Sequence, residues 1–242
     1  MRLHVREWGG GDRIAVLIHG LSGWSATWNA VGPELASRGY RVLAPDLRGH
    51  GESPRGRYSS GDWVSDLVET LPQAPELAFG HSMGGALLLE ATARLRPRFA
   101  VYEDPAWRLA PNPEQAIAEF EKRKALTLED IATANPRWPE EVVRARHAGL
   151  ALWDPATARA FIGGNGERTP SARPAGPSLV LLAQDSPYVP APAADRLRGL
   201  GWRVQTLAGT GHHLHVDDRP AFMTSVAGWL AGSAAANPDA SG

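Results

Sequence analysis

The chain has 242 residues, a formal net charge of −1 from 25 basic and 26 acidic residues, and no cysteine. Both signs of charge are spread through the sequence, which argues against nucleic acid or anionic membranes as partners, and the lack of cysteine excludes disulfides, a thiolate nucleophile and Cys-ligated zinc. The first residues lack the apolar core of a signal peptide, and no apolar run approaches the ~20 residues that span a bilayer, so a cytoplasmic protein is expected.

Short apolar runs alternate with helical segments along most of the chain. The predicted strands are Arg13–Gly20, Tyr40–Leu47, Leu77–Ser82, Phe99–Pro105, Ser178–Asp185 and Trp202–Gly209, with an additional edge strand in "LHVREWG" near the start. The predicted helices are Thr27–Arg38, Ser60–Leu71, Met83–Leu95, Pro192–Leu200 and Arg219–Leu230. Runs without strict polar alternation are typical of strands that are buried on both faces. The pattern predicts an α/β fold with a doubly wound, mainly parallel sheet of about seven to eight strands and functional groups at the carboxyl ends of the strands.

Residues 107–177 contain no strand candidate. They hold the helical stretches "PEQAIAEFEKRKAL", "TLEDIATAN" and "PEEVVRARHAGLALW", followed by a Gly/Pro-rich connection. An insertion of about 70 residues between two strands is far longer than an ordinary connection. We expect a helical cap over the strand ends, with surface decoration as the alternative. Residues 1–106 and 178–231 would then form the core, and 232–242 a flexible tail.

The stretch GHSMG (Gly80–Gly84) matches the pattern G-x-S-x-G where a predicted strand meets a predicted helix. A nucleophile elbow requires this context, because the serine must sit on a tight, strained turn that projects its oxygen into the site. Glycines two positions before and after the serine avoid collisions with neighbouring backbone, and Gly85 allows close approach of helix and strand. The helix N-terminus also directs its dipole toward developing negative charge. Ser82 is therefore the predicted nucleophile.

A serine hydroxyl needs a base to take its proton, and a third group must orient that base. Three histidines follow the last predicted strand in "LAGTGHHLHVDDRP". His212 comes directly after Gly-Thr-Gly and is the predicted base. His213 is the alternative, and His215 is expected to pack or hydrogen-bond at the start of the final helix. His50 and His147 have no comparable placement and are expected to be structural or exposed.

The acid that orients the base is expected at another strand end. The run Ser178–Asp185 ends in Asp185, one strand–helix–strand unit before His212. Its carboxylate would accept the imidazole Nδ1–H and stabilise the imidazolium that forms during attack. Glu103 and Asp104 end an earlier strand and are the alternative acids, since a side chain from that strand could also reach the histidine.

The tetrahedral intermediate of acyl transfer carries an oxyanion that needs preorganised hydrogen-bond donors. One candidate is the backbone N–H of Met83, directly after the predicted nucleophile. The second is expected in the loop after "AVLIHG", where Leu21 follows a strand end. The amides of Leu21 and Met83 are therefore the predicted oxyanion hole.

Four segments together resemble the α/β-hydrolase superfamily over nearly the whole chain: "LIHGLSGWSATW", "VLAPDLRGHGES", "GHSMGG" and "GTGHHLHVDDRPAF". The chain order Ser82, Asp185, His212 also matches that family. The resemblance implies an α/β-hydrolase fold with a Ser-His-Asp triad at the strand ends, a cap after the strand that follows the nucleophile helix, and a structural part for Asp46–Ser53 beside the site. A serine nucleophile disfavours the dehalogenase and epoxide-hydrolase branches, which attack through a carboxylate.

The predicted triad indicates acyl transfer to water, so we expect a serine esterase or lactonase that needs neither cofactor nor metal. Tryptophans beside the oxyanion loop and in the cap favour an apolar or aromatic small molecule as substrate. The predicted pocket residues are Trp24, Trp28, Trp107, Trp138 and Trp153. Thioesterase action and carbon–carbon bond hydrolysis are alternatives on the same framework, and a receptor that binds a small ligand without turnover is a third. The sequence does not indicate an oligomeric state.

Overall fold

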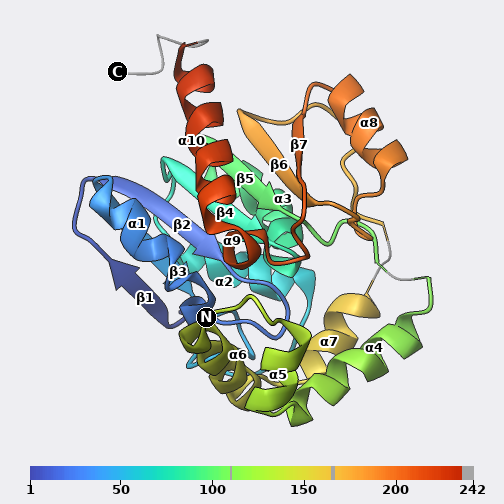
Figure 1. Ribbon diagram of the computed structural model, residues 1–242. Helices are drawn as coiled ribbons and strands as arrows, with labels where there is room; N and C mark the ends of the chain where they lie inside the picture. Colours follow the sequence, from blue (N-terminus) through green and yellow to red (C-terminus); the bar gives the residue numbers. More distant parts are fainter. Residues whose placement is uncertain (110, 165–166, 236–242) are drawn as a thin grey trace.

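The computed structural model describes residues 1–109, 111–164 and 167–235, in which seven strands form one sheet (Figure 1). The strand order is β1-β3-β2-β4-β5-β6-β7; β1 is antiparallel to β3, and all other neighbours are parallel. The strands are β1 (Val5–Trp8), β2 (Arg13–Ile18), β3 (Tyr40–Pro45), β4 (Leu77–His81), β5 (Phe99–Glu103), β6 (Ser178–Ala183) and β7 (Arg203–Leu207). The predicted doubly wound, mainly parallel sheet is confirmed.

Helices fill the connections between the strands. The helices of the core are η1 (Ser25–Trp28), α1 (Val31–Ser37), α2 (Ser60–Thr70), α3 (Met83–Leu95), α8 (Ala191–Gly199), α9 (Leu214–Asp217) and α10 (Arg219–Ala235). Between β5 and β6 the chain forms α4 (Pro113–Lys122), η2 (Arg123–Ala125), α5 (Leu128–Ala134), α6 (Glu140–Leu152) and α7 (Ala156–Ile162). This second group lies together below the sheet in Figure 1 and is called the cap below. No helix in the described residues is long and apolar enough to cross a membrane.

Three segments differ from the sequence predictions. The helix expected over Thr27–Arg38 is split into η1 and α1, because Pro33 has no N–H with which to continue a helix from the preceding turn. Helix α7 was not predicted. Helix α10 runs on to Ala235 through a stretch rich in alanine, so residues 232–235 are helical rather than part of the predicted tail. The rest of that tail, 236–242, lies outside the described residues.

Successive residues of the central strands enter two separate hydrophobic clusters on opposite faces of the sheet. On one face, Leu17 and Phe79 pack with side chains of α1 and α10. On the other, Ile18 and Tyr102 pack with side chains of α2, α3 and α8, and cap residues such as Phe161 join this cluster. Because helices cover both faces, the central strands are mostly apolar. Residues of the cap belong to the same hydrophobic core as one face of the sheet.

The register of the sheet places the carboxyl ends of β2, β4 and β5 side by side. Ile18 pairs with Gly80, and Gly80 pairs with Tyr102. The loops that follow these strands therefore meet at one edge of the sheet, where ligand sites of open α/β folds form. The cap contacts this edge, since Trp24 Nε1 in the loop after β2 donates to the carbonyl of Ala145 in α6 at 2.9 Å.

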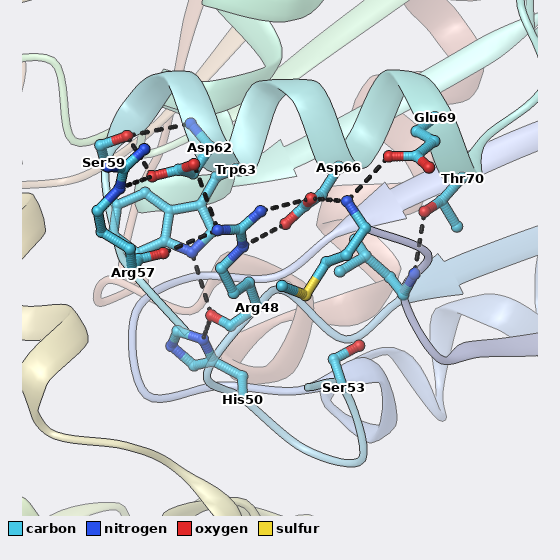
Figure 2. Close-up of polar contacts among 12 residues, drawn as sticks. Arg48, His50, Ser53, Arg57, Ser59, Asp62, Trp63, Asp66, Glu69 and Thr70 are labelled. Atoms are coloured by element: carbon cyan, nitrogen blue, oxygen red, sulfur yellow. Dashed lines mark hydrogen bonds and ion pairs between the residues drawn. The ribbon is translucent and has the colours of Figure 1, made fainter. Parts of the chain in front are cut away.

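A buried ion pair fixes the loop after β3 to helix α2 (Figure 2). Arg48 Nε and Nη2 donate to the two carboxylate oxygens of Asp66, each at 2.7 Å, and Nη1 donates to the carbonyl of Arg57. Asp66 is fully buried, and Trp63 Nε1 donates to the carbonyl of Arg48 at 3.1 Å. Arg48 belongs to the segment Asp46–Ser53, which thus has the structural part that the family resemblance implies.

We expect Asp66→Ala to lower the free energy of unfolding by about 3 kcal/mol, because Arg48 would lose its buried two-point partner and keep only Asp62, a more exposed carboxylate 3.3 Å from Nη1. Urea denaturation measures the change. Glu140→Ala is the matched control, since it removes the exposed partner of Arg144 on α6 and should cost no more than about 0.5 kcal/mol. An Asp66→Ala variant as stable as this control would show that the ion pair does not hold the loop.

Candidate active site

Ser82 lies on a strained turn between β4 and α3. Its φ of 54° and ψ of −117° are values that residues with a β-carbon rarely adopt, and such strain is concentrated at functional sites. The N–H of Ser82 donates to the carbonyl of Glu103 at 2.9 Å, and its carbonyl accepts the N–H of Ala106 at 3.0 Å. The end of β5 and the loop after it therefore hold the turn in place. This is the elbow geometry that the G-x-S-x-G pattern predicts.

Close backbone contacts require the glycines around the serine. A β-carbon on Gly80 would lie 2.5 Å from the carbonyl oxygen of Gly84, and a β-carbon on Gly84 would lie 2.4 Å from the carbonyl oxygen of Ile18. A β-carbon on Gly85 would lie 2.8 Å from Cβ of Pro105. Any larger residue at these positions would force the backbones apart. The close approach brings the start of α3 against the end of β2.

His212 lies beside the elbow, and its ring is hydrogen-bonded to Asp104. His212 Nδ1 donates to Asp104 Oδ2 at 2.6 Å, and Asp104 Oδ1 accepts the N–H of Ala183 at 3.2 Å. With Nδ1 as the donor, the ring keeps an acceptor lone pair on Nε2, which has no hydrogen bond to any described residue. The side chain of His212 is 27% exposed, whereas that of Asp104 is fully buried. The ring is thus oriented by an acid and can accept a proton from a neighbour.

The carboxylate that contacts His212 is that of Asp104, one of the two alternatives, and not that of Asp185. Strand β6 ends at Ala183, and Asp185 is exposed beyond it with no hydrogen bond to His212. Asp104 directly follows β5 in a positive-φ conformation of 37°, and its N–H donates to the carbonyl of Leu181 at 2.7 Å. Strand order alone would not have given this result, since β6 and not β5 adjoins β7, the strand that precedes His212. The hydrogen bond from His212 to Asp104 identifies which of the two carboxylates orients the ring.

Glu103, the other alternative acid, holds a different histidine. Its carboxylate oxygens lie 2.7 and 2.9 Å from His215 Nδ1, and Oε1 also accepts the His215 N–H at 3.0 Å. Both side chains are fully buried, and the ring of Trp28 stacks on His215 with the centroids 4.3 Å apart. Burial raises the pKa of Glu103, but the neighbouring His215 and His81 outweigh this effect and leave the pKa below its ordinary value. His215 is a packed, hydrogen-bonded residue, as the sequence predicts.

Two further histidines surround the base. His81 Nε2 donates to the backbone carbonyl of His212 at 2.9 Å, and the two ring centroids lie 4.7 Å apart. Burial lowers the pKa of His81 to about 3, and its buried Nδ1 has no partner, as in a neutral ring. Burial also lowers the pKa of His213 well below its ordinary value. No described carboxylate hydrogen-bonds to His213, so it lacks the orienting acid that His212 has.

Buried histidines also fix the loop after β2. His19 Nδ1 donates to the carbonyl of Gly20 at 2.8 Å, and its Nε2 accepts the N–H of Leu47 at 2.9 Å. His50 Nε2 accepts the N–H of Ser22 at 3.2 Å. The backbone on both sides of residue 21 is therefore held by imidazole rings.

The amides of Leu21 and Met83, the predicted oxyanion hole, lie on the two sides of the elbow. A β-carbon on Gly20, the neighbour of Leu21, would lie 3.0 Å from Cβ of Ser82. Met83 is the first residue of α3, where N–H groups have no acceptor within the helix. Neither amide has a hydrogen-bond acceptor among the described residues.

A cavity of about 540 Å³ opens between α6 and the loops around the elbow. The lining residues nearest to Ser82 and His212 in the sequence are Gly20 and Leu21 of the loop after β2, His81 and His213. Ser82 and His212 do not themselves line it, but they adjoin it through His81 and His213, which directly neighbour them in the chain. The walls include apolar side chains of α6 and of the core, such as Val142 and Val216.

Of the five predicted pocket tryptophans, only Trp138 lines this cavity, and its Nε1 donates to Asp217 Oδ1 at 2.7 Å. Three are fully buried in the hydrophobic core: Trp28, Trp107 and Trp153. Trp24 attaches the cap to the loop after β2. The prediction of pocket contact is wrong for the three buried rings, because large aromatic side chains bury the most apolar area in a core.

Sequence reasoning missed the parts played by His81 and Arg146 and left His50 as structural or exposed. His81 fills a variable position of the G-x-S-x-G pattern, and His50 lies in the "RGHGES" segment, so each stood beside a motif that could have drawn attention to it. Arg146 has no such signal. It reaches the loop after β2 from the middle of α6, where its guanidinium donates to the carbonyl and the hydroxyl of Ser22.

Known proteins show the same fold and sequence pattern. The profile of the alpha/beta hydrolase family matches residues 15–225, and the chain belongs to this family. The sn-1-specific diacylglycerol lipase ABHD11 of Mus musculus is 30% identical over 262 residues, covering 89% of this chain and 80% of that protein. The uncharacterized protein Rv2715 of Mycobacterium tuberculosis is 41% identical over 87 residues, which is 34% of this chain and only 25% of that protein. The enol-lactonase from Burkholderia xenovorans LB400 superimposes with a TM-score of 0.75 at 23% identity, covering 95% of this chain and 96% of that one.

The pKa of His81 makes a prediction about acid stability. Between pH 6.5, the ordinary pKa of the residue, and about pH 3, its pKa in the fold, the unfolded chain binds one more proton at this position. The free energy of unfolding therefore falls as the pH drops through this range, by up to about 1.4 kcal/mol per pH unit from His81 alone. His81→Gln keeps an amide donor for the His212 carbonyl and removes the titration, so we expect a shallower slope below pH 6.5.

Urea denaturation at several pH values between 7 and 4 measures this slope. His147→Gln, which removes an imidazole from α6 outside the site, is the control for the general effect of losing a histidine. Equal slopes for the wild type and His81→Gln would contradict the assignment of a neutral, buried His81.

Proposed function

We propose that the chain is a serine hydrolase that cleaves a carboxylic ester or lactone of a small molecule, with Ser82 as nucleophile, His212 as base and Asp104 as acid. One observation carries the proposal: the His212 ring is held by a 2.6 Å hydrogen bond from Nδ1 to a buried carboxylate, beside the strained turn of Ser82. A serine hydroxyl is a weak nucleophile until such a base removes its proton. Membership of the alpha/beta hydrolase family supports the same function.

In the proposed reaction, His212 Nε2 takes the proton of Ser82 Oγ as the oxygen attacks the carbonyl carbon. The resulting oxyanion accepts hydrogen bonds from the amides of Leu21 and Met83. When the bond to the leaving group breaks, the imidazolium protonates the departing alcohol and an acyl group remains on Ser82. A water molecule, deprotonated by the same nitrogen, then releases the acid and restores the serine. Asp104 maintains the Nδ1–H tautomer and stabilises the imidazolium.

The cavity supports a small-molecule substrate. Its volume of about 540 Å³ lies within the range of cavities that bind small ligands, and its walls combine apolar side chains with a few polar groups. An ester or lactone is favoured over an amide, because an alcohol is a better leaving group than an amine. The enol-lactonase that shares the fold provides an example of lactone chemistry on a similar framework.

Ser82→Ala is expected to abolish hydrolysis of p-nitrophenyl acetate, with a loss in kcat of at least about 10⁴-fold, because no other group can carry the acyl intermediate. An aryl alkylphosphonate should add once to the wild type at Ser82, as measured by intact mass and peptide mapping, and should not add to the variant. Circular dichroism and thermal unfolding check that the fold is unchanged. If Ser82→Ala turned over the ester as fast as the wild type, Ser82 would not be the nucleophile.

Asp104→Asn should lower kcat by about 10³–10⁴-fold, because an amide in this place favours the wrong imidazole tautomer. Asp185→Asn is the matched control and should leave kcat unchanged, since this side chain is exposed and does not contact the base. Steady-state kinetics on the same ester, with thermal unfolding of each variant, separates an effect on the reaction from an effect on stability. A loss of kcat in Asp185→Asn but not in Asp104→Asn would identify Asp185 as the acid.

A further inference from the structure

Arg146 of α6 carries a charge that no acidic residue balances in the part of the chain that the structure describes. Its Nη1 and Nη2 donate to the carbonyl and hydroxyl oxygens of Ser22, the latter at 2.9 Å, and within the described residues it has no ion pair. The side chain is half-buried and lines the cavity. Burial, followed by the nearby charge of Arg123, lowers the pKa of Arg146 to about 9. A guanidinium in this environment is stabilised by a countercharge, and none of the described residues forms an ion pair with it.

Arg123 of η2 is a second cation of the cap, and it forms no ion pair within the described part of the chain. Its guanidinium lies over the ring of Phe120, 3.9 Å from the centroid. Burial lowers its pKa, and the charges of Tyr188 and Glu119 offset this effect only in part. The ring centroid of Tyr188 lies 4.9 Å from that of His212, whereas the charge of Arg146 acts on His213.

The acidic residues of the cavity have other partners or lie in solvent. Asp217 accepts hydrogen bonds from Trp138 Nε1 at 2.7 Å and from the N–H of Gly211 at 2.8 Å. Asp218 accepts the N–H of Ala221 at 3.0 Å, and Glu141 is exposed. None of them contributes to the pKa of Arg146.

A neighbouring arginine on the same helix shows the ordinary arrangement. Arg144 is exposed and forms an ion pair with Glu140, one turn earlier in α6, at 2.5 Å. Arg146, two residues further along, points to the cavity instead and has only neutral partners. The contrast marks Arg146 as a cation whose countercharge comes from a ligand.

We propose that Arg146 forms an anion subsite in the cavity, and that the preferred substrate is an ester or lactone that also carries a carboxylate. This inference rests on the proposed hydrolase function and names its substrate class. A guanidinium binds the two oxygens of a carboxylate through parallel N–H groups, and Arg123 adds to the attraction. Ser22 directly follows Leu21, so a carboxylate held by Arg146 would fix the position of the ester carbonyl relative to the oxyanion loop and Ser82.

The test compares two substrates that differ in charge and hardly in shape: the mono-p-nitrophenyl ester of adipic acid and the p-nitrophenyl ester of adipic acid monoamide. The wild type should prefer the anionic ester in kcat/KM by about 10–100-fold, the range of a charge-assisted contact. Arg146→Gln should lose this preference through a selective fall with the anionic ester. Arg144→Gln, on the same helix, should keep it.

Two outcomes overturn the subsite and leave the hydrolase in place. One is equal turnover of both esters by the wild type. The other is an equal fall with both esters in Arg146→Gln, which would make Arg146 only an attachment of the cap to the loop after β2. Should Arg146→Gln unfold, Arg146→Lys serves instead; it keeps the charge without the planar fork and should retain part of the preference.

Binding separates this inference from the proposed function. Isothermal titration calorimetry compares adipate with adipamide on the wild type and on Arg146→Gln. The wild type should bind adipate more tightly than adipamide, and Arg146→Gln should bind adipate about tenfold more weakly than the wild type. This result supports the subsite even if neither ester is hydrolysed and the phosphonate does not label Ser82. That combination would refute the proposed hydrolase function and leave the anion subsite in place. Equal binding of adipate and adipamide to the wild type would refute the subsite.

Discussion

The hydrogen bond between His212 and the buried carboxylate of Asp104 is the contact on which the proposed chemistry depends. It sets the tautomer of the ring, and with it the nitrogen that keeps a lone pair for a proton. Asp104 is in turn fixed by the backbone of β6, since its N–H donates to Leu181 and its Oδ1 accepts from Ala183. The pairing of β5 with β6 therefore positions the acid, and the sheet acts as the rigid support of the site.

Burial distinguishes one histidine from several neighbours of the same chemical type. His81, His213 and His215 all have ring centroids within 5.5 Å of at least one other ring in the group. Burial lowers the pKa of His81 and His213, and Glu103 retains His215 in the core. Only His212 combines an acidic partner with access to solvent. Four imidazoles can thus lie close together while only one of them has the contacts that a general base needs.

Local patterns in the sequence predicted the strands and the strained turn at Ser82, because each depends mainly on neighbouring residues. His212 could be proposed as the base because it follows a strand end. Asp104 and Asp185 both follow strands, so sequence could not choose between them. Only the hydrogen bond between Asp104 and His212 separates them. The tryptophans were misplaced because burial depends on packing across the whole core. Arg146 was missed because its environment is created by a distant loop.

The bonds from Arg146 to Ser22 and from Trp24 to Ala145 join one cap helix to the loop that carries a proposed oxyanion donor. The imidazole rings of His19 and His50 hold the same loop from the core, through the carbonyl of Gly20 and the N–H of Ser22. The loop therefore has two independent sets of anchors, one in the cap and one in the core. A change in α6 would remove only the first set, so the backbone of the donor stays supported when residues of the cap are exchanged.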